Sequence, residues 1–99
     1  MRPVVTHREA SAELIAAALF YEQQVPGLGA DFLRRYDDLI AAICRRPRQW
    51  REVKRGIRKA GMTRFPYAVY FELQPKHIHI YAVAHQRRRP FYWLTRSAS

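Results

Sequence analysis

Apolar and polar positions follow different periods in the two halves of the chain, and each period predicts its own kind of element. Residues 2–6 are a short β-branched run with a proline near its start, which is typical of an edge strand because proline at that position removes no ladder hydrogen bond. From His7 apolar side chains recur at every third or fourth position, which predicts a helix ending near Gln24. A second stretch with the same spacing begins at Phe32 and stops before Pro47, so two helices are expected.

The segment between these helices is rich in residues that favour turns. Residues 25–29 contain one proline and two glycines, a composition that reverses the direction of the chain over a short distance. Asp31 follows directly and is placed to help cap the second helix. The two helices are therefore expected to form a hairpin.

The second half of the chain changes to a period of two. Residues 47–56 show no period and predict a basic loop in which Trp50 is a partial anchor against the core. A weak strand is expected at residues 57–63, and two strong strands are expected at residues 65–73 and 77–85 with a short turn between them. Three consecutive strands joined by short turns predict an antiparallel meander.

The alternation assigns the side chains of the two strong strands to opposite faces of the sheet. The apolar set is expected to cover the helical hairpin and consists of Phe65, Tyr67, Val69, Phe71, Leu73, Ile78, Ile80, Ala82 and Ala84. The other face of the last strand is too polar for a core and predicts an open, concave surface carrying His77, His79, Tyr81, Val83 and His85. A basic and aromatic tail follows at residues 87–96.

These elements predict an α+β fold with the order β-α-α-β-β-β, in which a small, mostly antiparallel sheet packs on a helical hairpin and ends in a short C-terminal tail. The chain has 99 residues, of which 48% are hydrophobic, so it is expected to form a single domain over residues 1–99. Its first residues lack the apolar region of a secretory signal, and no apolar stretch is long enough to span a membrane. A cytoplasmic location is therefore expected.

Charge divides the chain more sharply than composition does. The formal net charge is +10, but residues 1–44 contribute a net −2, whereas residues 45–99 contribute a net +12 with only Glu52 and Glu72 opposing fourteen basic side chains. Such a distribution favours a polyanionic partner, either nucleic acid or an acidic protein segment. A basic face that is merely solvated is the alternative.

Cysteine and histidine provide no sign of a metal site or a reactive thiol. The only cysteine, Cys44, lies in an apolar run of the second helix, where a small buried side chain fits, and no histidine is close to it in the sequence. His77 and His79 are not accompanied by a cluster of cysteines or carboxylates. We therefore expect no metal and no small-molecule cofactor.

Three motifs give the chain its resemblance to a known family. PGLG stands between the helices at residues 26–29, RFPY opens the central strand at 64–67, and AVAHQRRRPFYW covers residues 82–93. In this order and spacing, over nearly the whole chain, they resemble the RelE/ParE toxin superfamily of type II toxin–antitoxin systems. The resemblance implies a toxin that arrests growth and that a cognate antitoxin neutralises by wrapping a partly helical segment over it.

The resemblance also implies one of two mechanisms. ParE-like members interfere with DNA gyrase as binders, whereas RelE-like members cleave mRNA at the ribosome without a metal. The three motifs look closer to the ParE-like branch, because the lysine-rich pattern of the ribonucleases is matched only loosely here. A third hypothesis is a basic nucleic-acid-binding module that is not toxic.

The ribonuclease hypothesis needs a proton acceptor, a proton donor and cations around a phosphate. The candidates for catalysis are His85, Tyr92 and Arg64. The candidates for binding the target or nucleic acid are Arg58, Lys59, Arg64, Arg87, Arg88 and Arg89. Structural roles compete with these: His85 is equally typical of a strand-end histidine bonded to backbone, and Tyr92 and Trp93 of packing groups.

Overall fold

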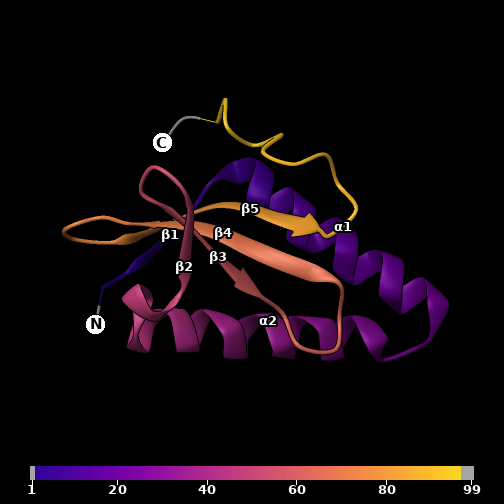
Figure 1. Ribbon diagram of the computed structural model, residues 1–99. Coiled ribbons are helices and arrows are strands. Elements are labelled where there is room, and N and C mark those ends of the chain that lie inside the picture. The colour runs from indigo at the N-terminus through magenta and orange to yellow at the C-terminus, as the bar shows by residue number, and fades with distance from the viewer. Residues whose placement is uncertain (1, 97–99) are drawn as a thin grey trace.

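The computed structural model describes residues 2–96, so the two ends of the expected domain, residues 1 and 97–99, lie outside the described residues. Two helices and five strands are present, joined by short connections (Figure 1). In chain order they are β1 (Val4–Thr6), α1 (Arg8–Gln24), α2 (Leu28–Arg45), β2 (Arg51–Lys54), β3 (Ile57–Gly61), β4 (Tyr67–Leu73) and β5 (Ile78–His85), with a 3-10 turn, η1 (Pro47–Gln49), before β2. Within residues 2–96, neither helix has the length and apolar character needed to cross a membrane.

The five strands form one sheet in the order β1-β5-β4-β3-β2. β1 runs parallel to β5, and all other neighbours are antiparallel, which confirms the predicted α+β fold with a mostly antiparallel sheet. α1 and α2 pack against one face of this sheet, called here the helix face. The C-terminal tail crosses the opposite face, called here the tail face (Figure 1).

β2 corrects the prediction of a basic loop at residues 47–56. Arg51 pairs with Lys59, and Lys54 pairs with Ile57 across a tight turn in which Gly56 has a φ of 76°. The strand has only four residues and three of them are charged, so it carries no alternation of apolar and polar side chains. It forms because β3 presents an unpaired edge directly after the turn. Trp50, at its start, packs against the core as expected.

The connection between the helices is fixed from α1 rather than by Asp31. The carboxylate of Glu22 accepts hydrogen bonds from the N–H groups of Gly27, at 2.9 Å, and Gly29, at 3.0 Å. α2 therefore begins at Leu28, earlier than the apolar spacing indicated, and Asp31 lies in its first turn. A Cβ at Gly29 would lie 2.6 Å from the carbonyl oxygen of Ala18, so the glycine permits the close approach of the two helices.

The main core lies between the helices and the helix face of the sheet. The predicted apolar face of β4 and its preceding turn is confirmed, because Phe65, Val69 and Phe71 are buried there and Tyr67 and Leu73 pack against them. The helices contribute large buried side chains to the same cluster, among them Phe32, Tyr36, Leu39 and Ile43. Cys44 packs against this core as expected.

A β-bulge in β5 overturns the predicted division of that strand. Phe71 pairs with Ile80 and Tyr70 pairs with Ala82, which leaves Tyr81 as an extra residue. Ile78, Ile80 and Val83 therefore belong to the helix-face core, whereas Tyr81 and Ala82 pack under the tail. The predicted placement of Ala82 and Ala84 on the helix face is wrong, because the bulge shifts the alternation by one residue.

The prediction of an open surface along β5 is also wrong. Seven of its eight residues are buried, and His79, Tyr81 and Val83 are among them. Tyr81 and Ala82 are covered by the C-terminal tail, whereas Val83 is covered from the helix side because of the bulge.

Candidate functional site

Trp93 holds the C-terminal tail on the tail face. Its side chain is only 1% exposed, and its ring centroid lies 4.8 Å from that of Tyr70 and 6.4 Å from that of Tyr81. The aromatic contact and the burial of a large apolar surface fix the path of the segment after β5. The arginines between His85 and Trp93 are thereby placed above the sheet.

Glu13 of α1 holds the same tail from the side. Arg96 donates to both carboxylate oxygens of Glu13, at 2.8 and 3.0 Å, and the hydroxyl of Tyr92 donates to one of them. Arg96 also donates to the carbonyl oxygen of Tyr81 at 2.8 Å, and the N–H of Val83 donates to Glu13 at 3.0 Å. Burial alone would raise the pKa of Glu13, but the hydrogen bonds from Arg96, Tyr92 and Val83 outweigh it and lower that pKa.

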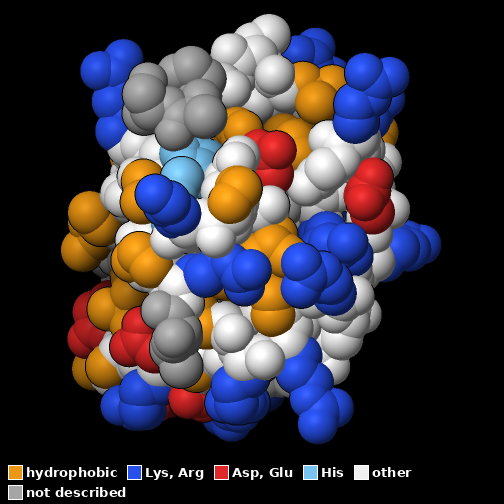
Figure 2. All heavy atoms as spheres, turned by 90° about the vertical axis from the view of Figure 1, so that its left-hand side faces the viewer, with side chains coloured by type: hydrophobic (Ala, Val, Ile, Leu, Met, Phe, Trp, Pro, Cys, Tyr) orange, Lys and Arg blue, Asp and Glu red, His pale blue; other side chains and the backbone are white. Residues whose placement is uncertain are grey.

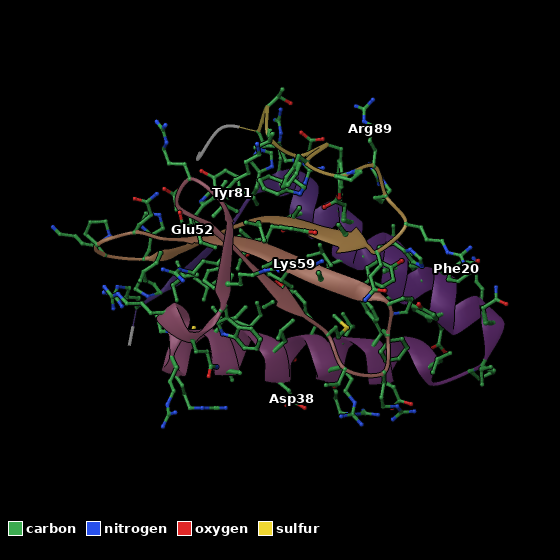
Figure 3. The ribbon with its side chains drawn as sticks, viewed as in Figure 1. Phe20, Asp38, Glu52, Lys59, Tyr81 and Arg89 are labelled. Atoms are coloured by element: carbon green, nitrogen blue, oxygen red, sulfur yellow. The ribbon has the colours of Figure 1, made fainter. Side chains whose placement is uncertain are left out.

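A basic cleft of about 220 Å³ lies between this tail and the tail face of the sheet. Its cations come from three separate parts of the chain, namely β2, β3 and the tail: Arg51, Lys59, Arg88 and Arg89. Its remaining surface is formed by Val53, Ala68, Tyr70, Ala84, His85, Gln86, Pro90, Phe91, Tyr92 and Trp93. Among residues 2–96, no carboxylate lines the cleft. Figure 3 shows Lys59 on the sheet beneath the tail that carries Arg89.

Five of the residues predicted from the sequence line this cleft: Lys59, His85, Arg88, Arg89 and Tyr92. Arg51 is an additional member that the sequence did not reveal. Because residues 47–56 were predicted to be a loop, there was no strand on which to place it. Its pairing with Lys59 puts both cations on the same face of the sheet.

The other three predicted binding residues lie elsewhere. Arg58 pairs with Phe71 and so projects from the helix face, where it donates to the carbonyl oxygen of Trp50 at 2.6 Å. Arg64 lies in the turn between β3 and β4 with a φ of 72°, and Arg87 lies in the turn after β5. Neither lines the cleft. Basic side chains therefore lie on more than one surface of the molecule, and many of them lie on the face drawn in Figure 2.

His85 and Tyr92 have structural hydrogen bonds in addition to their places in the cleft. The Nδ1 atom of His85 accepts from the N–H of Arg87 at 3.0 Å, and its ring lies edge-on to Tyr67 at 5.1 Å. Burial and the bond to Glu13 raise the pKa of Tyr92 far above its ordinary value. The guanidinium of Arg88 lies 3.8 Å from the centroid of the Tyr92 ring, a cation–π distance.

Comparison with known proteins places this fold in a family. The family model described as ParE toxin of type II toxin–antitoxin system, parDE, matches residues 4–90. The chain belongs to the ParE toxin family. None of the curated protein sequences matches it.

A solved structure supports the fold of this ParE-family chain. It is titled "Chromosomal ParDE TA system from P. aeruginosa" and is similar with a TM-score of 0.75, at 19% sequence identity, over 86% of this chain and 96% of that chain. The predicted kinship with the RelE/ParE superfamily is therefore confirmed. The ParE family match ends at residue 90, so Tyr92, Trp93 and Arg96 lie beyond it.

The ParE-family chain has a second, mostly apolar groove of about 430 Å³ between α1, the start of β4 and the end of β5. It is lined by Glu13, Ala16, Ala17, Phe20, Tyr21, Tyr67, Val83, His85 and Arg88. Phe20 lines this groove and still exposes more than half of its surface, as do Ile15 and Leu19 on the same helix; Figure 3 labels Phe20 on α1. His85 and Arg88 line both the groove and the basic cleft.

A cluster of histidines lies at the opposite end of β5. The ring centroid of buried His79 is 6.5 Å from that of His7 and 6.2 Å from that of His77. Both ring nitrogens of His79 lack a hydrogen-bond partner. Within residues 2–96, no three His, Cys, Asp or Glu side chains are arranged as the ligands of a metal ion would be.

Proposed function

We propose that this chain is the toxin of a type II toxin–antitoxin pair, that it arrests growth by interfering with DNA gyrase, and that a cognate antitoxin neutralises it. The observation that carries the proposal is the ParE toxin family match, which spans both helices and all five strands. Gyrase acts on DNA, and a toxin with a formal net charge of +10 is attracted to a complex that contains a polyanion.

Binding is favoured over mRNA cleavage by the two residues that would carry out proton transfer. A general base needs a free lone pair facing the substrate, and a general acid needs a transferable proton near the working pH. The Nδ1 atom of His85 accepts from a backbone N–H, which places the proton of the neutral ring on Nε2 and leaves no free lone pair for a substrate, and the proton of Tyr92 is directed to Glu13. Burial and Glu13 also keep the tyrosine protonated by raising its pKa.

The apolar groove and the exposed face of α1 suit an antitoxin segment. The groove offers alanine and aromatic surface from α1, and Arg88 stands at its border. An amphipathic segment could place apolar side chains against Phe20 and Ala17 and an acidic side chain near Arg88. Because Arg88 also lines the basic cleft, a segment bound in the groove would contact both surfaces at once.

Induced expression of the chain alone tests the toxic activity. Growth should stop, and co-expression of the neighbouring open reading frame should restore it. Unimpaired growth would instead favour the non-toxic nucleic-acid-binding module.

Two assays with purified protein separate the targets. Gyrase supercoiling should be lost, or gyrase-dependent DNA cleavage should accumulate, while mRNA on programmed ribosomes stays intact. The variants His85→Ala and Tyr92→Phe should retain toxicity, because a toxin that acts by binding needs no proton transfer. Cutting of mRNA that both substitutions abolish would establish the ribonuclease alternative.

A further inference from the structure

We infer that the basic cleft binds single-stranded nucleic acid, with a phosphate among its four cations and a base against its apolar and aromatic wall. The inference deepens the proposed function and rests on it in one respect: the bound strand would be DNA or RNA that belongs to the toxin's target. The binding itself is a property of this chain and can be measured without that target.

The cations of the cleft are available to an anion. Arg51, Lys59, Arg88 and Arg89 form no salt bridge with any carboxylate in residues 2–96, in contrast to Arg34, Arg58 and Arg96, which do. Four like charges around one small space repel one another unless a counter-charge enters. A phosphodiester supplies that charge together with acceptor oxygens for the guanidinium and ammonium donors.

The wall of the cleft suits a nucleobase. Ala68 and Ala84 are directly paired across β4 and β5, and their small side chains leave room above the sheet. Tyr70 lies next to them, and Phe91, with 37% of its surface exposed, stands at the tail side. A planar base can stack one of its two faces on an aromatic ring when it is in a single strand, whereas both faces are covered by neighbouring bases within an intact duplex.

The same features argue against an acidic peptide as the occupant. A carboxylate would satisfy the cations, but an extended acidic side chain has no aromatic face to match Tyr70 and Phe91.

The size of the cleft excludes a nucleic-acid duplex as its occupant, because a volume of about 220 Å³ is too small to admit one. The combination of clustered cations and aromatic surface therefore points to an unpaired nucleotide.

Fluorescence anisotropy with the full chain tests the inference directly. A labelled oligothymidylate and a labelled oligouridylate of equal length serve as probes, and a poly-glutamate peptide serves as competitor. We expect binding with a dissociation constant on the order of 10 µM at physiological salt, falling in strength as salt is raised. The two probes distinguish a DNA source from an RNA source.

Two kinds of variant divide the site into its parts. Arg51→Ala and Lys59→Ala should each weaken binding and reduce the slope of log affinity against log salt by about 0.7. Phe91→Ala should weaken binding about tenfold with the slope unchanged, and Phe91→Trp should restore it. Arg34→Ala is the matched control, since it removes the same charge from the exposed side of α2 and should bind as the parent does.

Three results would overturn the inference: no binding by the folded parent chain, equal loss in Arg34→Ala and the cleft variants, or displacement of the strand by poly-glutamate at equal charge concentration. Because the assay contains no gyrase, a failure here leaves the proposed toxic function intact. Conversely, strand binding by a chain that leaves gyrase unaffected would uphold the cleft and reject the gyrase proposal.

Discussion

Glu13 connects the first helix to the far end of the chain. It accepts hydrogen bonds from Arg96 and Tyr92, residues separated from it by 83 and 79 positions. In the sequence it is an ordinary acidic residue on the polar side of a helix, and no local pattern distinguishes it from Glu9 or Glu22. Its role depends on where the tail lies, which is determined by tertiary packing rather than by period.

We predict that Glu13→Gln destabilises the protein by about 2 kcal/mol, because the nearly buried Arg96 loses its closer carboxylate and keeps only the exposed Glu9, at 4.0 Å. Because the pKa of Glu13 is lowered in the folded state, its contribution to stability is fully present above the unfolded-state pKa of 4.5. This contribution is lost as the pH falls through the folded-state pKa. Urea unfolding at neutral and acidic pH measures both effects. Asp38→Asn, on the outer side of α2 in Figure 3, should change stability by less than about 0.5 kcal/mol. Equal effects of the two substitutions would contradict the role of Glu13.

His79 is a buried base whose pKa is lowered, first by burial and then by the nearby His77 and His7. The folded state therefore binds fewer protons than the unfolded chain, so stability should decrease as the pH falls below the unfolded value of 6.5. His79→Phe removes the two unpartnered ring nitrogens and should flatten this dependence without loss of stability at neutral pH. Urea midpoints compared at about pH 7.5 and about pH 5.5 test it, and an unchanged pH dependence in the variant would reject the assignment.

At the scale of elements, the sequence predicts regular structure well and irregular structure poorly. Both helices and the strands β3, β4 and β5 appear as period changes, because each buries a face of regular spacing. The bulge at Tyr81 has no such signature, since Tyr81 and Ala82 suit either face of a sheet. β2 is missed because three of its four residues are charged, so it has no apolar alternation and becomes a strand only by pairing with β3.

The missed strand β2 and the weak pattern of β3 explain which residues of the candidate site could be predicted from the sequence. Lys59, Arg88 and Arg89 were identified by charge, and the structure brings them together. Arg51 was missed with its strand, and Arg58 was included because a weak strand gave no reason to separate it from its neighbour Lys59. Adjacent residues in a strand face opposite ways, so an accurate register would have assigned them to different surfaces.

The contact between the two helices has a testable dependence on one glycine. Gly29→Ala would place a methyl group 2.6 Å from the carbonyl oxygen of Ala18, and we expect a loss of about 2 kcal/mol in the free energy of unfolding. Gly61→Ala meets nothing within 4 Å and has an ordinary backbone conformation, so it should be neutral or slightly stabilising. Thermal or urea unfolding of the pair decides the matter, and comparable destabilisation by both would refute the packing argument.

At the scale of the whole molecule, the tail acts as a third layer over the sheet. Trp93→Ala removes its largest buried side chain, and we predict a loss of about 3–5 kcal/mol in the free energy of unfolding. Leu94→Ala, whose side chain is 48% exposed, is the control and should cost less than about 1 kcal/mol. Urea unfolding followed by circular dichroism measures both. A tail that merely rests on the surface would give two small and similar values.

The parallel pairing of β1 with β5 has a consequence for synthesis. β1 can form its hydrogen bonds only after residues 78–85 have been synthesised, and Glu13 can pair with Arg96 only after residue 96 has been added. During translation α1 can pack against α2 early, but the side of α1 that contacts β5 stays exposed until that strand has been made, because contacts of long sequence separation form late. A nascent chain that stops short of residue 78 therefore lacks any partner for its N-terminal strand, and the surface of α1 that β5 would bury remains in contact with water.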